Sequence, residues 1–595
     1  MKEPQKHADL PVEMTWDLTK MYPTNEDWEK DFRKIDSLVR KFQKFKGHLA
    51  DSPATLAKAF QAEDELSFLL EKLHTFAHLR SDEDTGISEN RGRVDRILAK
   101  SAEIEGDTAW FEPEIMKIDR KEFRKLAKAP ELKFYALTMK RLEADRPHTL
   151  SEAEERVLGL SGEVFGGPYK TFSVMNDADL KFPVIKDAAG ADVRLTHGNY
   201  IKLLESADRN VRRDAFKGIY SVYGQFKNTF AAILDTAVKS HVVDAKLHKF
   251  KSALEASLFE DAVPVSVYES LISTVHDSFT PLYDYFKFRA KRLGLKKLDM
   301  YDIHCPLVPD AAMEVEWKDA VQYVKEALRP LGKTYGSILD KAFKERWIDI
   351  PEAQGKRSGA YSSGCYRFPP YLLLNYSGNL DSVFTLAHEL GHSMHSYKSD
   401  AAQPKAKADY KIFVAEVAST VNEVLLLKYL LKNGTDVKLK KYLCSYYLEM
   451  IRTTIFRQTM FAEFEYIAHD SAEKGIPLTK DYLNGEYLKL NKKYYGDAVI
   501  SDDEIAFEWA RIPHFYNAFY VYKYATGLIS AISIAERIYA EGDKAVEDYF
   551  RFLSSGGSDG PVELLKLAGV DLTKKDAYEA MVRSFEATLA EFESL

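Results

Sequence analysis

Cysteine is scarce in this sequence, which has 595 residues and three cysteines, Cys305, Cys365 and Cys444. They lie far apart and are odd in number, so they exclude a disulfide framework, and no CxxC pair offers a thiolate metal site. A reducing environment suits such a chain best. No stretch of about 18 apolar residues is present, and the N-terminal residues lead into no apolar targeting segment. We therefore expect a soluble, cytoplasmic protein without a membrane partner.

An excess of one charge sign is also absent. The 83 basic and 91 acidic residues give a net charge of -8 and are mixed along the chain. We therefore expect no nucleic acid as a partner, because the charge pattern predicts no basic surface. Hydrophobic residues make up 45% of the chain and aromatic residues 12%, which excludes wholesale disorder. A chain of this length can bury several cores, which large helical folds merge into two lobes.

Apolar residues recur at helical spacing through most of the chain. Between Trp28 and Phe42 they fall on one face of a helix that begins near Thr24 or Asn25. Similar stripes occupy residues 66–76 and the long run from about residue 196 to residue 247. We expect a mainly α-helical protein in which most aromatic rings pack in the core.

Two segments depart from this helical pattern. Residues 180–195 hold two short apolar runs around an Asp-Ala-Ala-Gly turn, which predicts a hairpin. Residues 355–378 combine glycines and prolines with a short Tyr-Leu-Leu-Leu run, which predicts a second small sheet. We place a domain boundary after the hairpin, with an N-terminal helical lobe over residues 1–195 and a second region over residues 196–595.

The sequence HELGH at residues 388–392 carries the clearest chemical signal. On a helix, positions i and i+4 share one face, so His388 and His392 can bind one zinc ion. A helix is supported by the apolar positions before the motif, with Asp381 as a candidate N-cap. Glu389 is rotated by about 100° from His388, so it can reach a water on the metal as a general base. A chance match to HExxH is the alternative, and a third ligand would argue against it.

Two residues downstream of the motif compete for the place of third ligand. His395 lies about 10 Å further along the helix axis than His388, so packing or an outer contact explains it better. Residue 398 is Lys398, which excludes the zincin class that has a histidine there. Glu416 interrupts the apolar run 411–419, and a carboxylate on an apolar helix face is unfavourable unless it is paired or binds a metal. We take Glu416 as the third ligand.

Glu423 lies seven residues after Glu416, on the same helix face. It could accept the second N–H of an imidazole that binds the metal. A solvated charge on the helix surface explains Glu423 equally well.

At these residues the sequence resembles the M3 family of zinc metallopeptidases, and within it the oligoendopeptidase F group. The resemblance covers most of the chain and rests on residues 207–212 (ADRNVR), 252–256 (SALEA), 388–395, 413–423 and 511–516 (RIPHFY). It implies a mainly α-helical gluzincin fold, with two lobes flanking a deep central channel, zinc on the channel floor and small β-sheet elements near the active site. By this resemblance, residues 196–595 form the zinc peptidase catalytic region, His388, His392 and Glu416 bind the zinc, and Glu389 is the base.

The resemblance also assigns chemistry to residues 513–524. The family uses a His and a Tyr from this segment to bind substrate and stabilise the oxyanion. Here the segment offers one imidazole and several phenols, which are donors at neutral pH because Tyr titrates at about 10. His514 and Tyr522 are the first candidates and Tyr520 is the alternative. Core packing is the competing explanation for any single tyrosine of the segment.

Together with the residues above, the resemblance implies zinc-dependent hydrolysis of internal peptide bonds, with one zinc ion per chain and Glu389 as general base. The expectation of short peptides as substrates rests on the resemblance alone. The substrate backbone is expected to pair with the edge of the small sheet near Tyr361. A zinc exopeptidase would share the metal site but need a group for a free terminus, which no sequence feature singles out. A noncatalytic helical peptide-binding protein would have no use for Glu389 between two histidines.

Overall fold

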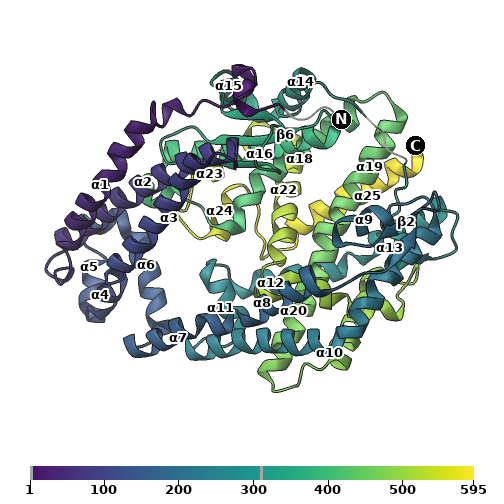
Figure 1. The fold of residues 1–595 in the computed structure, drawn as a ribbon, viewed down its shortest axis with the longest axis horizontal. Coiled ribbons are helices and arrows are strands. Elements are labelled where there is room, and N and C mark those ends of the chain that lie inside the picture. The colour runs from purple at the N-terminus through teal and green to yellow at the C-terminus, as the bar shows by residue number, and fades with distance from the viewer. Residues whose placement is uncertain (1–4, 309–312) are drawn as a thin grey trace. The chain divides into compact units, whose positions relative to one another are not determined.

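The computed structural model describes residues 5–308 and 313–595 and is mainly α-helical, as expected (Figure 1). The chain forms two compact units, each built from three separate stretches. Unit 1 comprises Met1–Pro147, Ala312–Tyr429 and Ile534–Gly569, and unit 2 comprises His148–Ala311, Leu430–Ser533 and Val570–Leu595. The boundary predicted after residue 195 thus falls inside a stretch of unit 2.

The helices of unit 1 come from all three of its stretches. They are α1 (Asn25–Gln43), α2 (Pro53–Glu83), α3 (Ser88–Thr108), α4 (Phe111–Lys117), α5 (Arg120–Leu126), α6 (Ala136–Asp145), α14 (Trp317–Ala327), α15 (Gly332–Lys344), α16 (Leu380–Ala402), α17 (Lys405–Ala408), α23 (Asp543–Leu553) and α24 (Pro561–Leu567). Two further helices, α18 (Ile412–Asn433) and α22 (Tyr522–Glu541), have residues in both units.

Helix α1 follows the predicted pattern. The side chain of Thr24 caps its N-terminus by accepting a hydrogen bond from the backbone N–H of Asp27. Trp28, Ile35 and Phe42 are buried on one face, while polar residues occupy the other, so packing stabilises the helix. Helices α1, α2 and α3 lie side by side (Figure 1).

The sheet predicted within residues 355–378 is confirmed as part of a three-stranded sheet in unit 1. Its strands are β4 (Ile348–Pro351), β6 (Tyr371–Tyr376) and β5 (Tyr361–Ser363), in the order β4-β6-β5. The central strand β6 is parallel to β4 and antiparallel to β5, with Leu373 opposite Tyr361. Residues 371–374 are fully buried, which explains their uninterrupted apolar run. Because β5 stands at one end of the strand order, it is an edge strand.

Helix α16 begins soon after β6 and carries the HELGH sequence. Its N-cap is Asn379, whose side chain accepts a hydrogen bond from the backbone N–H of Ser382. The prediction of Asp381 as the cap was wrong, because Asp381 lies within the first turn of the helix, where its side chain is exposed. Leu386 before the motif, Leu390 within it and Met394 after it are buried, so packing holds the helix on both sides of the motif.

The elements of unit 2 include the hairpin predicted within residues 180–195. It consists of β1 (Val184–Lys186) and β2 (Asp192–Arg194), which are antiparallel. The helices of unit 2 are α7 (Glu152–Phe165), α8 (Gly167–Val174), α9 (His197–Leu204), α10 (Arg209–Leu247), α11 (Ala253–Glu260), α12 (Val265–Asp277), α13 (Phe279–Arg292), α19 (Val437–Ile451), α20 (Arg457–Glu473), α21 (Lys480–Tyr495) and α25 (Asp576–Ser594). Strands β3 (Leu298–Asp299) and β7 (Val499–Ile500) pair in parallel.

The three cysteines of the chain are free and buried. Among the helices of residues 5–308 and 313–595, none is long and apolar enough to cross a membrane.

Candidate active site

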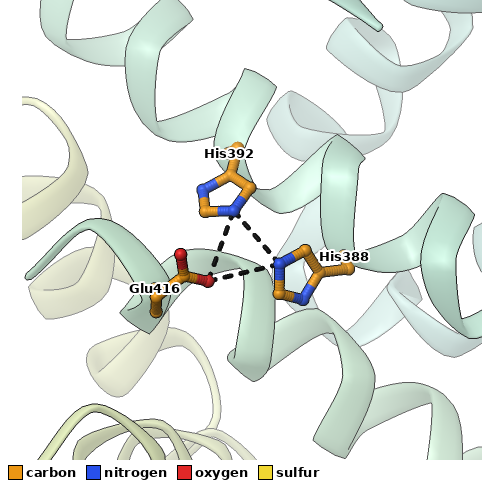
Figure 2. A group of neighbouring side chains, drawn as sticks. All are labelled: His388, His392 and Glu416. Carbon is orange, nitrogen blue, oxygen red and sulfur yellow. Dashed lines mark hydrogen bonds and ion pairs between the residues drawn. The ribbon is translucent and has the colours of Figure 1, made fainter. Parts of the chain in front are cut away.

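Helix α16 brings His388 and His392 together, one turn apart on the same face. Their Nε2 atoms are 3.1 Å from each other. Both side chains are mostly buried, with 27% and 18% of their surface exposed. Figure 2 shows both rings pointing toward the same point in front of the helix. The helical spacing predicted from the sequence is therefore realised.

Glu416, on α18, completes the group. Its Oε2 atom lies 3.2 Å from Nε2 of His388 and 3.4 Å from Nε2 of His392 (Figure 2). The Glu416 side chain is half exposed, so it does not lie in the apolar core that its sequence neighbours suggested. The two imidazoles nevertheless pair with it. Their hydrogen bonds hold the pKa of Glu416 well below its usual range.

The geometry of these three donor atoms suits a zinc ion. Two imidazole nitrogens and one carboxylate oxygen are a usual ligand set for zinc. Ligand atoms about 2.0–2.2 Å from a tetrahedral zinc ion are about 3.3–3.6 Å apart, close to the separations of 3.1, 3.2 and 3.4 Å found here. In the described part of the chain, no other group of three His, Cys, Asp or Glu side chains converges in this way.

Glu423, also on α18, contacts the His388 ring at Nδ1, whereas Glu416 lies near Nε2 of the same ring. The Oε1 atom of Glu423 accepts a hydrogen bond of 2.5 Å from Nδ1 of His388, as one of the two predictions for this residue proposed. The bond fixes the ring so that Nε2 faces Glu416. Burial acts to lower the pKa of His388, but the bonds to Glu416 and Glu423 outweigh burial and raise that pKa to about 10. The carboxylates of Glu416 and Glu423 thus favour a positive charge at the His388 ring.

Glu389 occupies a different environment from the other site carboxylates. Only 6% of its surface is exposed, and its Oε2 atom has no hydrogen-bond partner among the described residues. Burial raises the pKa of Glu389, while His388 and His392 act in the opposite direction. A buried carboxylate with a free oxygen and a raised pKa is suited to accept a proton at neutral pH.

The close approach of α16 and α18 depends on residues that the sequence analysis missed. Gly391 faces α18, and Asn422 donates a hydrogen bond of 2.9 Å from its side chain to the backbone oxygen of Ala387. Tyr335 in turn donates a hydrogen bond to the Asn422 side chain. A glycine inside a helix, between two ligand histidines, was the sequence signal for such a contact.

His395 does not join the metal-binding group. Its ring is buried and stacks on Tyr410, with ring centroids 3.7 Å apart and nearly parallel planes. Burial lowers the pKa of His395 to about 3, and nearby His392 adds to this effect. Packing, one of the two explanations that its position along the helix left open, is therefore the role of His395.

Strand β5 packs against α16, the helix that carries the histidines. The hydroxyls of Ser362 on β5 and Ser393 on α16 are 2.8 Å apart. Ser393 directly follows His392 in the sequence. The contact between the two hydroxyls therefore fixes the edge strand β5 relative to the histidine motif.

Unit 2 holds the candidate residues of the segment 513–524. His514 lies in a short 3-10 turn, Pro513–Tyr516, and is partly exposed. Burial lowers its pKa, and Arg457 adds to this effect, so the ring is neutral at pH 7. The ring of Tyr520 is partly exposed and lies 6.3 Å from the His514 ring, between centroids.

The remaining tyrosines of the segment differ in exposure. Tyr522 is fully buried in unit 2 and packs against Tyr268, with ring centroids 5.2 Å apart. Tyr524, one of the phenols of the segment but not among the candidates chosen from the sequence, has its hydroxyl 3.4 Å from Nε2 of His514. Its position four residues after Tyr520 was the available signal.

Comparisons with known proteins agree with the geometry in unit 1. The sequence model of Peptidase family M3 matches residues 202–584, and that of Oligopeptidase F matches residues 114–182. Oligopeptidase PepF of Bacillus subtilis (strain 168) is 44% identical over 602 residues, covering 100% of this chain and 90% of its own length.

Two solved structures extend the comparison to the fold. The crystal structure of oligoendopeptidase-F from Enterococcus faecium is 37% identical, covers 96% of this chain and 99% of its own, and has a TM-score of 0.72. A structure from Chlamydophila abortus is 34% identical, covers 100% of both chains and has a TM-score of 0.95. The resemblance seen in the sequence is therefore confirmed, and the chain belongs to peptidase family M3, a family of metallopeptidases.

Proposed function

We propose that this chain is a zinc-dependent endopeptidase that hydrolyses internal bonds of short peptides. The observation that carries the proposal is the convergence of His388, His392 and Glu416 at 3.1–3.4 Å, beside the buried carboxylate of Glu389. Three protein ligands would leave a further ligand position on the metal for water or substrate, as in catalytic zinc sites. One zinc ion per chain is expected.

The chemistry divides between the metal and the protein. Zinc, when bound, would polarise the scissile carbonyl and make water a better nucleophile. Glu389 removes a proton from the attacking water and delivers it to the leaving amine. Its free Oε2 atom and raised pKa support this role. Glu423 keeps the His388 ring in the orientation that ligation needs.

The segment 513–524 is proposed to stabilise the oxyanion. His514 and a nearby tyrosine would donate hydrogen bonds to the developing negative charge. The partial exposure of Tyr520 and its position beside His514 favour it over Tyr522, which is buried against Tyr268. Tyr522 was the first choice from the sequence, so both residues enter the test below.

The substrate is proposed to bind as an added strand. Strand β5 is an edge strand that packs on α16, so a peptide pairing with it would run close to the histidine helix. Short peptides are the expected substrates because the relatives are named as an oligopeptidase and an oligoendopeptidase. The free, buried cysteines support action in the reducing cytoplasm.

Product analysis tests this function. A library of peptides blocked at both termini would be incubated with the zinc-loaded protein, with and without a chelator, and the products identified by mass spectrometry. Cleavage of internal bonds that stops with the chelator is expected. Cleavage restricted to unblocked peptides would indicate an exopeptidase, and binding without cleavage would indicate a noncatalytic peptide-binding protein.

A further inference from the structure

The chain takes an unfavourable backbone conformation at Phe519, in the segment that carries His514 and Tyr520. Phe519 has a φ angle of 52°, in the left-handed region that residues other than glycine seldom adopt. Its side chain is fully buried. A strained residue of this kind persists only where the surrounding structure holds it in place.

One carboxylate holds the backbone at this point. Glu465, on α20, accepts a hydrogen bond of 2.6 Å from the backbone N–H of Phe519 through its Oε1 atom. Only 2% of Glu465 is exposed, and it forms no ion pair among the described residues. Lys523 is close by, but its ammonium group pairs with Asp261 at 2.5 Å. Burying a carboxyl group without an ion pair is unfavourable, and the bond to the Phe519 N–H is the one that this side chain makes among the described residues.

The neighbouring contacts hold the same turn from other sides. Ser257 donates a hydrogen bond of 2.9 Å to the backbone oxygen of Ala518. The rings of His469 and Tyr268 pack against Phe519, with centroids 4.5 and 5.7 Å from its ring. Among these contacts, the bond from Glu465 is the one made to the backbone N–H of Phe519 itself. It therefore acts directly on the backbone where the chain continues to Tyr520.

A second carboxylate on the same helix has a different function. Glu463 lies two residues earlier and pairs with His276 at 2.7 Å and Lys493 at 3.2 Å, and it accepts a bond from Tyr494. These contacts connect α20 to other helices of unit 2 and do not reach the turn. Glu463 therefore offers a matched control for the loss of a carboxylate from α20.

We propose that Glu465 is a positioning residue for the oxyanion-binding segment, because it fixes the left-handed turn at Phe519 and thereby presents Tyr520 beside His514. The inference rests on the proposed function, in which this segment stabilises the transition state. Glu465 itself need not touch the substrate. Its effect is on the orientation of a donor, so its loss lowers kcat more than it changes KM.

Two substitutions of Glu465 distinguish the effect of its side-chain length from the effect of its charge. Glu465→Gln keeps an oxygen at the same distance from the Phe519 N–H, and burial already raises the pKa of Glu465 to about 8, so a neutral side chain suits the site. Glu465→Asp keeps the carboxylate but withdraws it by one methylene. Glu465→Asp is expected to lower kcat by about 30-fold or more, whereas Glu465→Gln and the control Glu463→Asp stay within about threefold of the parent. Zinc content is expected to be unchanged in all three proteins.

A double-mutant cycle with Tyr520→Phe provides the decisive readout. In the parent protein, Tyr520→Phe is expected to lower kcat by about 100-fold. In the Glu465→Asp protein, the same change is expected to lower kcat by less than about fivefold, because the Tyr520 hydroxyl is already misplaced there. Equal effects in both backgrounds, or a parental kcat in Glu465→Asp, would overturn the positioning role.

His514→Ala, measured in parallel, distinguishes failure of this inference from failure of the proposed function. If His514→Ala and Tyr520→Phe lower kcat but Glu465→Asp does not, the positioning role alone is wrong. If His514→Ala and Tyr520→Phe are both silent, the segment has no part in catalysis, so the proposed oxyanion role and the positioning role are both wrong. The zinc site proposed in unit 1 is then still judged by the chelator experiment. Glu465→Gln is the least disruptive change, so a large loss of kcat in that folded variant would also contradict positioning by reach.

Discussion

Gly391 and Ala418 lie in direct backbone contact between the two helices that supply the candidate metal ligands. A Cβ atom on Gly391 would be 2.5 Å from the backbone oxygen of Ala418, and equally close to the Cα atom of Ser419. Real Cβ atoms do not approach backbone this closely, so a side chain here would force α16 away from α18. The glycine within the HELGH sequence therefore sets the distance between the two histidines and Glu416.

Substitution of this glycine is expected to disturb the metal site without touching a ligand. Gly391→Ala should lower the free energy of unfolding by about 1–3 kcal/mol or more and weaken zinc binding, measured by thermal unfolding and metal analysis. Gly92→Ala is the control, because Gly92 lies in α3 with open space around it. That change should leave zinc content unchanged and be neutral or stabilising by up to about 1 kcal/mol. Parental zinc affinity in Gly391→Ala would show that the close approach is unnecessary.

Removal of one ligand imidazole should remove the metal. His392→Ala is expected to lose zinc and peptidase activity together and keep its helix content, because a site on a large helical scaffold rarely holds the fold. Metal analysis, activity assays and circular dichroism would measure these effects. His395→Phe is the control on the same helix, since a phenyl ring can retain the stacking on Tyr410. Full activity of His392→Ala without zinc would disprove the ligand assignment.

The bond between Glu423 and His388 should contribute to metal affinity. Glu423→Ala removes the acceptor of the Nδ1 proton, and zinc affinity is expected to fall by about 10- to 100-fold, measured by competition with a chelator. Glu423→Gln keeps an acceptor oxygen and should lose less. Lys428→Ala, on the same helix but paired with Glu536, should leave the affinity unchanged. An unaltered affinity in Glu423→Ala would return Glu423 to the role of a surface charge.

The two candidate tyrosines should respond differently to loss of the hydroxyl. Tyr520→Phe is expected to lower kcat by about 10²- to 10³-fold with little change in KM or zinc content, since an oxyanion donor acts mainly in the transition state. Tyr522→Phe should keep kcat within about threefold, because its ring is buried in unit 2. Steady-state kinetics on a short blocked peptide would measure both. The opposite result would assign the role to Tyr522, as the sequence alone predicted.

Local features of the fold could be predicted from the sequence because their causes are local. A few adjacent residues determine each of three such features: the cap at Thr24, the turn of the hairpin and the apolar run of β6. The cap of α16 was misplaced by two residues, from Asn379 to Asp381, because both types of side chain cap helices well. The assembly of each unit from three separate stretches follows from long-range contacts that no short pattern records.

The candidate metal site was more predictable than its surroundings. Helical spacing places His388 and His392 on one face, and a carboxylate in an apolar run identified Glu416. The approach of α16 to α18 at Gly391 and the bond from Asn422 to Ala387 depend on packing between distant segments. The left-handed turn at Phe519 and its contact with Glu465 are also tertiary features, since nothing in either local sequence indicates them.

Glu389 is proposed as the base of a zinc peptidase, and one variant tests this role most directly. Glu389→Gln keeps the shape of the side chain but cannot accept the proton. Zinc content and turnover of a doubly blocked peptide would be measured in the same preparation, beside the parent protein. About one zinc per chain, with turnover lowered by about two to four orders of magnitude, is the expected result. Turnover close to that of the parent, with zinc still bound, would contradict the assignment.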